Sequence, residues 1–306
     1  MTSSTILPSA TAAAVRPDPS PPTAVSTLRL ALPKGRMQAE IDRLMNDAGL
    51  LVEPEIRGYR PRVRGIDGLE AKRLKPQAVV SMLGQGTRDL GFAGADWVEE
   101  LGIDVVQVLD TGLDPVRIVA AGPADLEVRR GDRVRVATEM PALAARWAAA
   151  RGIDLVPVRS WGTTEVLPPE DADVIVDVVQ TGATLAANGL RVIDEIGTSS
   201  TRLYASREAI DCRNRGPVVR RIADLLRAVL EARSRFLVEL NVGEADLEAV
   251  LAVLPCMRRP TVSRLAGSGY AVRAAVPRED FLDVVERVRA AGGTDLVVGE
   301  PRQVIP

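Results

Sequence analysis

The 306-residue chain contains no histidine. Histidine is the commonest general base and a frequent zinc ligand, so its absence excludes Ser-His and Cys-His nucleophiles and the HExxH metal site. Any chemistry must therefore use carboxylates, arginines, lysines, hydroxyls, backbone amides or a metal that arrives with the substrate.

Cysteine and lysine are nearly as scarce. Cys212 and Cys256 are the only cysteines and lie far apart, which predicts reduced packing residues rather than a metal site. Among 39 basic residues, lysine occurs only at Lys34, Lys72 and Lys75. This scarcity makes Lys34 more notable, although the base composition of the genome would produce the same bias.

Long apolar runs, basic runs and a compact signal pattern are also missing. The 39 basic and 41 acidic residues nearly cancel, so the composition favours neither a nucleic acid nor a membrane as partner. The longest apolar stretches have only the length of strands. We therefore expect a cytoplasmic globular protein, and 46% hydrophobic residues are enough for a sizeable core.

Short apolar strands alternate with amphipathic helices from Leu28 onward. This alternation predicts an α/β fold with a parallel sheet and helices on its faces. The last part of the chain follows the order βαββαβ, the ferredoxin-like arrangement. We expect two α/β lobes with a cleft between them, as in periplasmic binding proteins, followed by this small domain. No internal repeat is evident.

Composition and periodicity also predict the boundaries of these parts. The first residues are rich in Ala, Pro, Ser and Thr, which predicts a disordered tail. The predicted parts are a tail over 1–27, a first lobe over 28–115 with 207–234, a second lobe over 116–206, and a C-terminal domain over 235–306.

The most informative segment is DVIVDVVQTGATLAANGL, residues 173–190. An apolar strand there opens into a Thr-Gly-Ala-Thr turn, Thr181 to Thr184, before a helical turn. Such a turn presents backbone N–H groups, two hydroxyls and a positive dipole end to one point, as a phosphate requires. Four residues alone would equally suit an ordinary capped turn. Asp177 favours the phosphate interpretation, because its carboxylate is placed to accept hydrogen bonds from sugar hydroxyls.

Three weaker segments accompany this loop. In LPKGR, Lys34 and Arg36 lie between a strand and a helix, where they suit a polyphosphate or a solvated loop equally well. In TRDLGFAGAD, Gly94 would let a ligand approach the backbone, and Asp96 would cap the next helix. In SWGTTEV, Trp161 would stack on a base or simply pack.

Taken in order, LALPKGR, DLGFAGAD, RVAT, GTTEVLP, ADVIVDVVQTGATLAANGL and PTVSRL resemble the long form of ATP phosphoribosyltransferase. The resemblance covers essentially everything from Leu28 to Pro306. It implies a glycosyltransferase of histidine biosynthesis that joins adenine N1 of ATP to C1 of phosphoribosyl pyrophosphate, with Mg²⁺ carried by the substrate. It also implies a regulatory domain that binds the inhibitor L-histidine, and homodimers and homohexamers.

The resemblance implies a role for particular residues. It implies catalytic roles for Lys34, Arg36 and Asp177. The phosphoribosyl site would comprise Gly162, Thr163, Glu165, Asp173, Asp177, Thr181, Gly182, Ala183 and Thr184. The nucleotide site would comprise Lys34, Arg36, Asp89, Gly94 and Arg117. The histidine site would comprise Asn241, Met257 and Thr261.

Several residues depart from the family pattern. Gln180 stands where Ser is usual, and Trp161 and Thr163 replace small hydroxyl residues. The segment LKPQAV replaces an Arg-Pro-X-Asp pattern, and Asn241 replaces a common Asp. One alternative is a catalytically silent regulatory or binding paralogue of the same fold. Another is a solute-binding protein, because two α/β lobes around a cleft also describe that class, although it would usually carry a secretion signal.

Overall fold

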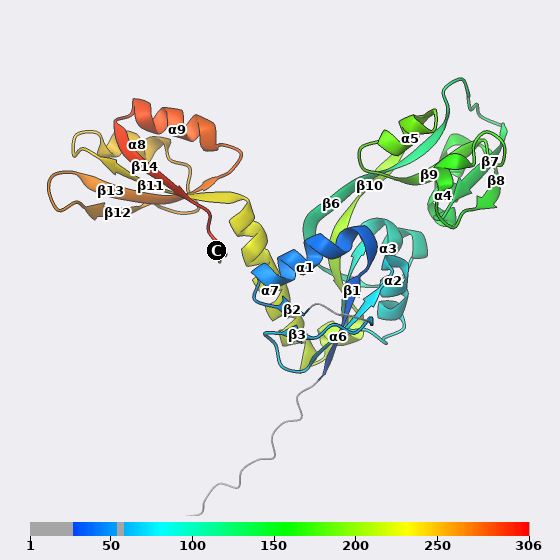
Figure 1. Cartoon of the computed structure of the whole chain (residues 1–306), viewed down its shortest axis with the longest axis horizontal. Helices are drawn as coiled ribbons and strands as arrows, with labels where there is room; N and C mark the ends of the chain where they lie inside the picture. Colours follow the sequence, from blue (N-terminus) through cyan, green and yellow to red (C-terminus); the bar gives the residue numbers. More distant parts are fainter. Residues whose placement is uncertain (1–26, 54–57, 306) are drawn as a thin grey trace, which may run out of the picture.

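The computed structural model describes residues 27–53 and 58–305 (Figure 1). The predicted tail therefore lies outside the described residues, except for Thr27. One sheet of eight strands runs through both lobes. Its strand order is β4 (Leu69–Leu74), β1 (Leu28–Pro33), β5 (Leu90–Gly94), β10 (Leu190–Ala205), β6 (Val106–Pro123), β9 (Val174–Val179), β7 (Arg133–Thr138) and β8 (Asp154–Arg159).

The prediction of a parallel sheet is confirmed at its two ends and is wrong in its centre. Strands β4, β1 and β5 are parallel, and so are β9, β7 and β8. Strands β6 and β10 are antiparallel to each other and to their outer neighbours, and they pair from Val106 with Ala205 to Pro123 with Leu190. These two long strands connect the lobes.

Helices cover both faces of the first lobe, as the amphipathic segments predict. One face packs against α1 (Gln38–Asp47) and α7 (Arg215–Arg233), around a core that includes Leu30, Phe92 and Leu226. The other face packs against α2 (Pro76–Gly84) and α3 (Ala95–Leu101). Because α7 completes this core, the first lobe needs residues from both ends of the range 28–234.

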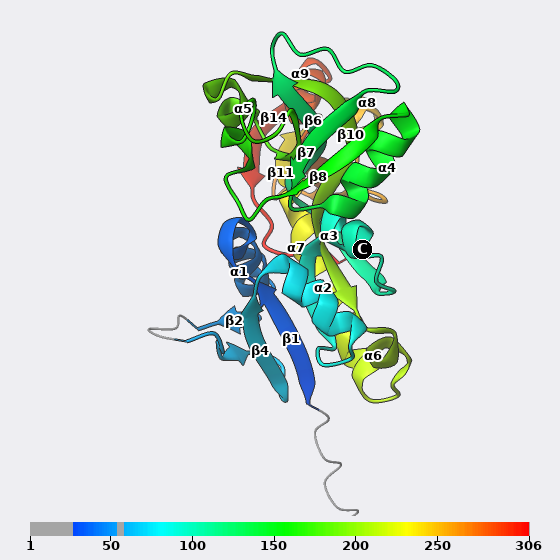
Figure 2. The same cartoon turned by 90° about the vertical axis from the view of Figure 1, so that its right-hand side faces the viewer.

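The second lobe has the same layered construction (Figure 2). Helix α4 (Pro141–Arg151) packs on one face through Leu143 and Trp147, and the short α5 (Ala183–Ala187) covers the other through Leu185. Pro141 opens α4 at its first turn, and Gly152 ends it with a φ of 69° in the left-handed region.

The two lobes repeat one structural plan that the sequence does not reveal. In each lobe a middle strand, β1 or β7, has one parallel neighbour on each side, followed by a crossing strand, β10 or β6. An arginine on each middle strand also binds the aspartate just before the neighbouring strand. Arg29 binds Asp89, and Arg135 binds Asp173, each through the backbone N–H and the guanidinium. We call these two pairs the Arg–Asp clamps.

The C-terminal domain has the predicted ferredoxin-like order. Its sheet is β12 (Thr261–Arg264), β13 (Tyr270–Pro277), β11 (Arg235–Val242) and β14 (Gly293–Gly299). Helices α8 (Leu247–Val253) and α9 (Phe281–Ala290) pack on one face through Val250, Val284 and Val288. Figure 1 shows this domain at the far end of α7 from the remaining short helix, α6 (Arg207–Asp211).

Smaller elements complete the described chain. They are the hairpin β2 (Leu51–Val52) and β3 (Val63–Arg64), and the 3-10 turns η1 (Gly35–Met37) and η2 (Thr164–Val166). No helix in the described ranges has the length and apolar character needed to cross a membrane. We retain the boundaries 28–115 with 207–234, 116–206 and 235–306 as a proposal, supported by the separate cores of these parts.

Candidate functional site

The carboxyl ends of the parallel strands of both lobes meet over the crossing strands. At the end of β5, Gly94 pairs with Thr201 of β10, and at the end of β9, Val179 pairs with Arg117 of β6. Arg117 in turn pairs with Thr198, only three residues from Thr201. Ligands of open α/β sheets bind outside such strand ends. The cleft between the lobes therefore lies over residues 198–201.

The predicted phosphate loop borders this cleft from the second lobe. Gly182 has a φ of 81°, a left-handed conformation that favours glycine, and it caps the short helix α5. The side chain of Thr181 accepts a weak hydrogen bond of 3.4 Å from the N–H of Ala183. Thr181, Ala183 and Thr184 are exposed, so their hydroxyls and amides remain accessible to a ligand.

Asp177 lies near the end of β9, four residues before this loop. Burial raises the pKa of its carboxyl group to about 6. The hydrogen bond from the N–H of Val178, 2.7 Å long, and one with Thr164 oppose this shift, while the negative charges of Glu165 and Glu139 add to it. The carboxylate therefore lies among other acidic groups and favours a ligand of positive or hydrogen-bond-donating character.

The structure adds two residues that the sequence analysis missed. Thr164, not Thr163, has its hydroxyl at Asp177 and also contacts Ser160 at 2.8 Å. Thr163 donates to the carbonyl oxygen of its neighbour Gly162. Glu139 follows β7 directly, so its position after a strand could have identified it. In the described part of the chain, no three His, Cys, Asp or Glu side chains are grouped as metal ligands.

A cationic pocket lies at the ends of β1 and β4 in the first lobe. It has a volume of about 330 Å³ and is lined by all three lysines of the chain together with Tyr59, Arg60, Arg73 and Leu74. The ammonium group of Lys34 lies 4.3 Å from the centre of the Tyr59 ring. Repulsion from Arg88 and Arg60 lowers the pKa of Lys72. We call this site the lysine pocket. Its positive charges suit a polyphosphate.

Two of the weaker expectations concern residues that are buried in the first lobe. Gly94 is buried, and a Cβ atom there would lie 2.0 Å from a carboxylate oxygen of Asp96, so the glycine makes room for Asp96. Asp96 lies in the first turn of α3 and not at its N-cap, which is Gly94. It accepts a hydrogen bond of 2.8 Å from Ser199 on β10 and feels the positive charge of Arg36.

The Arg–Asp clamps bear on two further expectations. Asp89 and Asp173 precede β5 and β9, so they lie at the amino ends of these strands, away from the cleft. The side chain of Asp89 is only 1% exposed, and Arg29 and Arg215 bind both of its oxygens. Both aspartates therefore stabilise the fold, and we expect neither to contact the nucleotide or the sugar.

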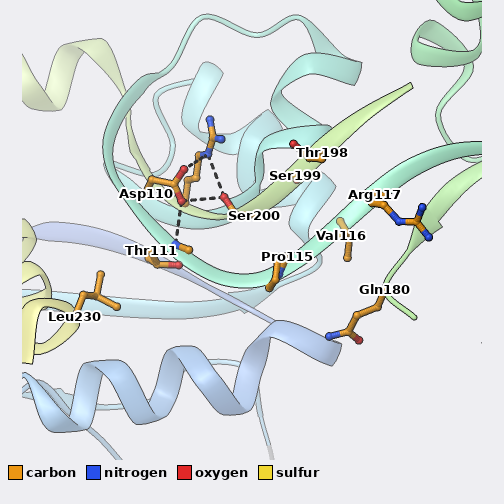
Figure 3. A pocket seen from close by; sticks show the side chains of 12 residues that line it. Asp110, Thr111, Pro115, Val116, Arg117, Gln180, Thr198, Ser199, Ser200 and Leu230 are labelled. Atoms are coloured by element: carbon orange, nitrogen blue, oxygen red, sulfur yellow. Dashed lines mark hydrogen bonds and ion pairs between the residues drawn. The ribbon is translucent and has the colours of Figure 1, made fainter. Parts of the chain in front are cut away.

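Arg117 borders a different pocket from Lys34. This pocket of about 620 Å³ lies along the crossing strands, and Figure 3 shows Arg117 beside Gln180 at one end of it and Asp110 at the other. Arg117 also forms an exposed ion pair of 3.3 Å with Glu195. The loop residue that departs from the family pattern, Gln180, thus faces this second pocket.

The three residues predicted to bind L-histidine lie on the C-terminal domain. The side chains of Val238, Leu240 and Val242 point toward α8 and α9, so Asn241 lies on the uncovered sheet face, where it donates to Asp295 at 3.1 Å. Thr261 opens β12 in the register of Glu239, on the same face. Met257 is partly exposed in the loop before β12. The structure brings Asn241 and Thr261 to one surface.

Comparison with known proteins agrees with this architecture. Residues 75–229 match the family model for ATP phosphoribosyltransferase, and residues 232–300 match the model for the C-terminal domain of the same family. This chain belongs to the ATP phosphoribosyltransferase family.

Relatives of the family match over nearly their whole length. An ATP phosphoribosyltransferase of Pelotomaculum thermopropionicum is 32% identical over 91% of this chain and 99% of its own. One from Koribacter versatilis is 35% identical over 88% of this chain and 96% of its own. A chain of the solved ATP phosphoribosyl transferase (HisG:HisZ) complex from Thermotoga maritima aligns with a TM-score of 0.59 and 28% identity, covering 67% of this chain and 99% of its own.

Proposed function

We propose that this chain joins adenine N1 of ATP to C1 of phosphoribosyl pyrophosphate and releases pyrophosphate. The observation that carries the proposal is the pairing of Asp177 with the exposed loop from Thr181 to Thr184 at one edge of the interlobe cleft. The hydroxyls and amides of the loop suit the 5-phosphate, and the carboxylate above them suits the ribose hydroxyls. The family of the chain supports the same reaction.

The lysine pocket of the first lobe provides the second half of the site. Lys34, Lys75 and Arg60 are held together there despite their mutual repulsion, and an anion with several charges would relieve it. We assign the phosphates of ATP to this pocket. Arg36, exposed at the same strand end, extends it toward the cleft, and Gly162, Thr163 and Glu165 remain the proposed sugar contacts of the second lobe.

The reaction needs no strong base, which agrees with a chain that has no histidine. Adenine N1 attacks with a lone pair that is already available, the bond between C1 and the pyrophosphate oxygen breaks, and pyrophosphate leaves with that electron pair. Catalysis then depends on orientation and on charge stabilisation. The carboxylate of Asp177 stabilises the positive charge that develops on the ribose ring. Lys34 and Arg36 stabilise the departing pyrophosphate.

Magnesium enters this proposal as part of the substrate. Mg²⁺ prefers octahedral oxygen ligands and usually binds through substrate phosphates with one or two carboxylates. Glu139 and Glu165 lie close enough to Asp177 to influence its charge, and one or two of these carboxylates would fit the few protein contacts that such an ion needs. We also place the reaction in the cytoplasm, where both substrates are made.

Incubation with ATP, Mg²⁺ and phosphoribosyl pyrophosphate tests the proposal directly. The absorbance of the N1-substituted adenine should rise with time, and omission of phosphoribosyl pyrophosphate should abolish the rise. Thr181→Val should increase KM for phosphoribosyl pyrophosphate at least about tenfold, because it removes a phosphate contact. Thr27→Val, outside the lobes, is the control. No adduct at any protein concentration would favour a silent regulatory paralogue.

We further propose that the C-terminal domain binds L-histidine through Asn241, Met257 and Thr261 and thereby inhibits the enzyme. Asn241 and Thr261 lie on an uncovered sheet face, and an open face surrounds a small ligand poorly. A second copy of the chain would enclose the ligand, which supports the proposal of homodimers and homohexamers. Inhibition should therefore depend on the association state, which light scattering with and without histidine measures.

A further inference from the structure

A pocket of about 480 Å³ lies between the lobes and is built from both of them. The first lobe contributes the start of α2 and one side of α3. The second lobe contributes the ends of β7 and β8 and the start of α4. Its residues include Lys75, Trp97, Glu139, Pro141, Arg159 and Trp161. Two of the three tryptophans of the chain thus face one small space.

Trp161 is the unusual member of this set. This residue is 83% exposed, although a large indole ring normally finds a packing partner. The guanidinium of Arg159 lies 4.8 Å from the centre of the ring and holds it by a cation–π contact. Arg159 supports one side of the indole, and the remaining face is available to a flat ligand.

The pocket adjoins both halves of the proposed site. Lys75 lines this pocket and the lysine pocket, so the two pockets lie on either side of this residue. On the opposite side, Glu139 lines the pocket and lies close enough to Asp177 to influence its charge. A ligand that fills this space therefore has polyphosphate on one side and the ribose carboxylate on the other.

We propose that this interlobe pocket holds the purine base of the nucleotide and that Trp161, supported by Arg159, stacks on it. The inference rests on the proposed function, because it places the base of the same nucleotide. A base between Lys75 and Glu139 would lie beside the sugar carbon that it attacks. Stacking on a rigid indole fixes the plane of the ring and so orients its N1 atom. Trp161 is thus a positioning and specificity residue.

Kinetic constants and binding measurements on the full chain test this assignment. Trp161→Leu should raise KM for ATP about tenfold, the effect of losing one base–aromatic stack, and leave KM for phosphoribosyl pyrophosphate within about twofold. Trp161→Phe keeps a stacking face and should remain within about twofold of the wild type. Leu282→Ala, an exposed apolar residue of the C-terminal domain, is the matched control and should change neither constant.

Two partial ligands separate the base from the phosphates. By calorimetry, Trp161→Leu should weaken the binding of adenosine about tenfold and leave the binding of inorganic tripolyphosphate within about twofold. If the substitution weakens the binding of both ligands equally, it disturbs the whole cleft, and this result would overturn the proposal. Unchanged adenosine binding would overturn it as well.

The outcome also distinguishes this inference from the proposed function. If the wild type forms no adduct, but Trp161→Leu weakens the binding of adenosine, the proposed reaction is wrong and the base site stands. If the wild type is active and Trp161→Leu has the same KM for ATP, the base site is wrong and the reaction stands. A changed subunit number with unchanged KM would identify Trp161 as a subunit contact and contradict the inference.

Discussion

Burial raises the pKa of Asp177 to about 6, so this carboxyl group changes charge near neutral pH. In the role proposed for Asp177, only the ionised form stabilises positive charge on the ribose. We therefore expect kcat to fall as the pH decreases through about 6, because protonation removes that charge. Asp177→Asn should lower kcat about a hundredfold at pH 8, and the kcat of the variant should no longer fall as the pH decreases through about 6. If the fall persists in the variant, another group is responsible for the titration.

The same substitution should affect stability in the opposite direction. An unfolded aspartate has a pKa near 3.8, so between about pH 4 and 6 the folded chain binds more protons than the unfolded chain. The free energy of unfolding therefore falls as the pH rises through this window. At pH 8, Asp177→Asn should raise it by on the order of 1–2 kcal/mol. Urea unfolding should show no such gain at pH 4.

Asp89 provides the contrasting case. Burial alone would raise its pKa, but hydrogen bonds and charge from Arg29 and Arg215 outweigh burial and lower it. Asp89→Asn leaves two partly buried arginines without their partner, so it should lower the free energy of unfolding by about 3 kcal/mol. Thermal unfolding measures this loss. KM for ATP of the folded variant should stay within about twofold, and a large increase would restore Asp89 to the nucleotide site.

These aspartates also show what the sequence could and could not predict at single residues. Asp177 and the loop after it were recognisable because an acidic strand end precedes a Thr-Gly-Ala-Thr turn. Asp89 and Asp173 also lie next to an apolar strand in the sequence, but each precedes its strand. Since the direction of each strand follows from the sequence, their position at the amino ends of the strands was predictable. Trp97 was not predictable as a cleft residue, because its position depends on how the lobes meet.

Among the elements, α3 and α4 form a direct bridge between the lobes. The carboxylate of Glu100 on α3 accepts hydrogen bonds from the N–H groups of Ala142 and Leu143, at 3.0 and 2.8 Å, in the first turn of α4. Glu100→Ala removes this cap and should lower the free energy of unfolding by about 1–2 kcal/mol in urea. Glu99→Ala breaks only the exposed pair with Arg146 and should cost less than about 1 kcal/mol. Equal effects would contradict the capping role.

The elements that the sequence predicted poorly have a common physical origin. Strand β4 reads LEAKRL, with charges and no clean alternation, because it forms an edge of the sheet. The long strand β6 is hard to recognise as one element, since left-handed backbone at Gly112 and Asp114 interrupts its apolar pattern. Interior strands such as β9 were clear because burial on both faces keeps them apolar.

At the scale of the whole molecule, regulation should be separable from catalysis. Asn241→Ala should raise the histidine concentration for half-inhibition about tenfold, because it removes a polar contact of the proposed effector site. In the absence of histidine, kcat should not change. Asn214→Ala, an exposed asparagine before α7, serves as the control. If both variants are half-inhibited at the same histidine concentration as the wild type, histidine binds elsewhere.

The C-terminal segment connects the C-terminal domain to the first lobe. The N–H of Val304 donates to the carbonyl oxygen of Ala228 on α7, and the side chain of Gln303 donates to that of Asp47 at the end of α1. Helix α1 follows the loop of Lys34 and Arg36 almost directly. The order of strands and helices in the C-terminal domain was predictable from the sequence. The contact of residues 303 and 304 with the first lobe was not predictable, because it rests on two hydrogen bonds of an irregular segment.

The shared strands also determine when each lobe is able to fold during synthesis. The first core contains Leu203 of β10 and Ile222 of α7, more than 100 residues after Phe92 in the same core. The parallel strands and helices of the second lobe lie between these two contributions. A ribosome releases the chain from its amino end, so the second lobe completes its core while the first still waits for α7. The lobe that begins first in the sequence is thus the one that closes last, and until then its apolar strands lack the helix that covers them.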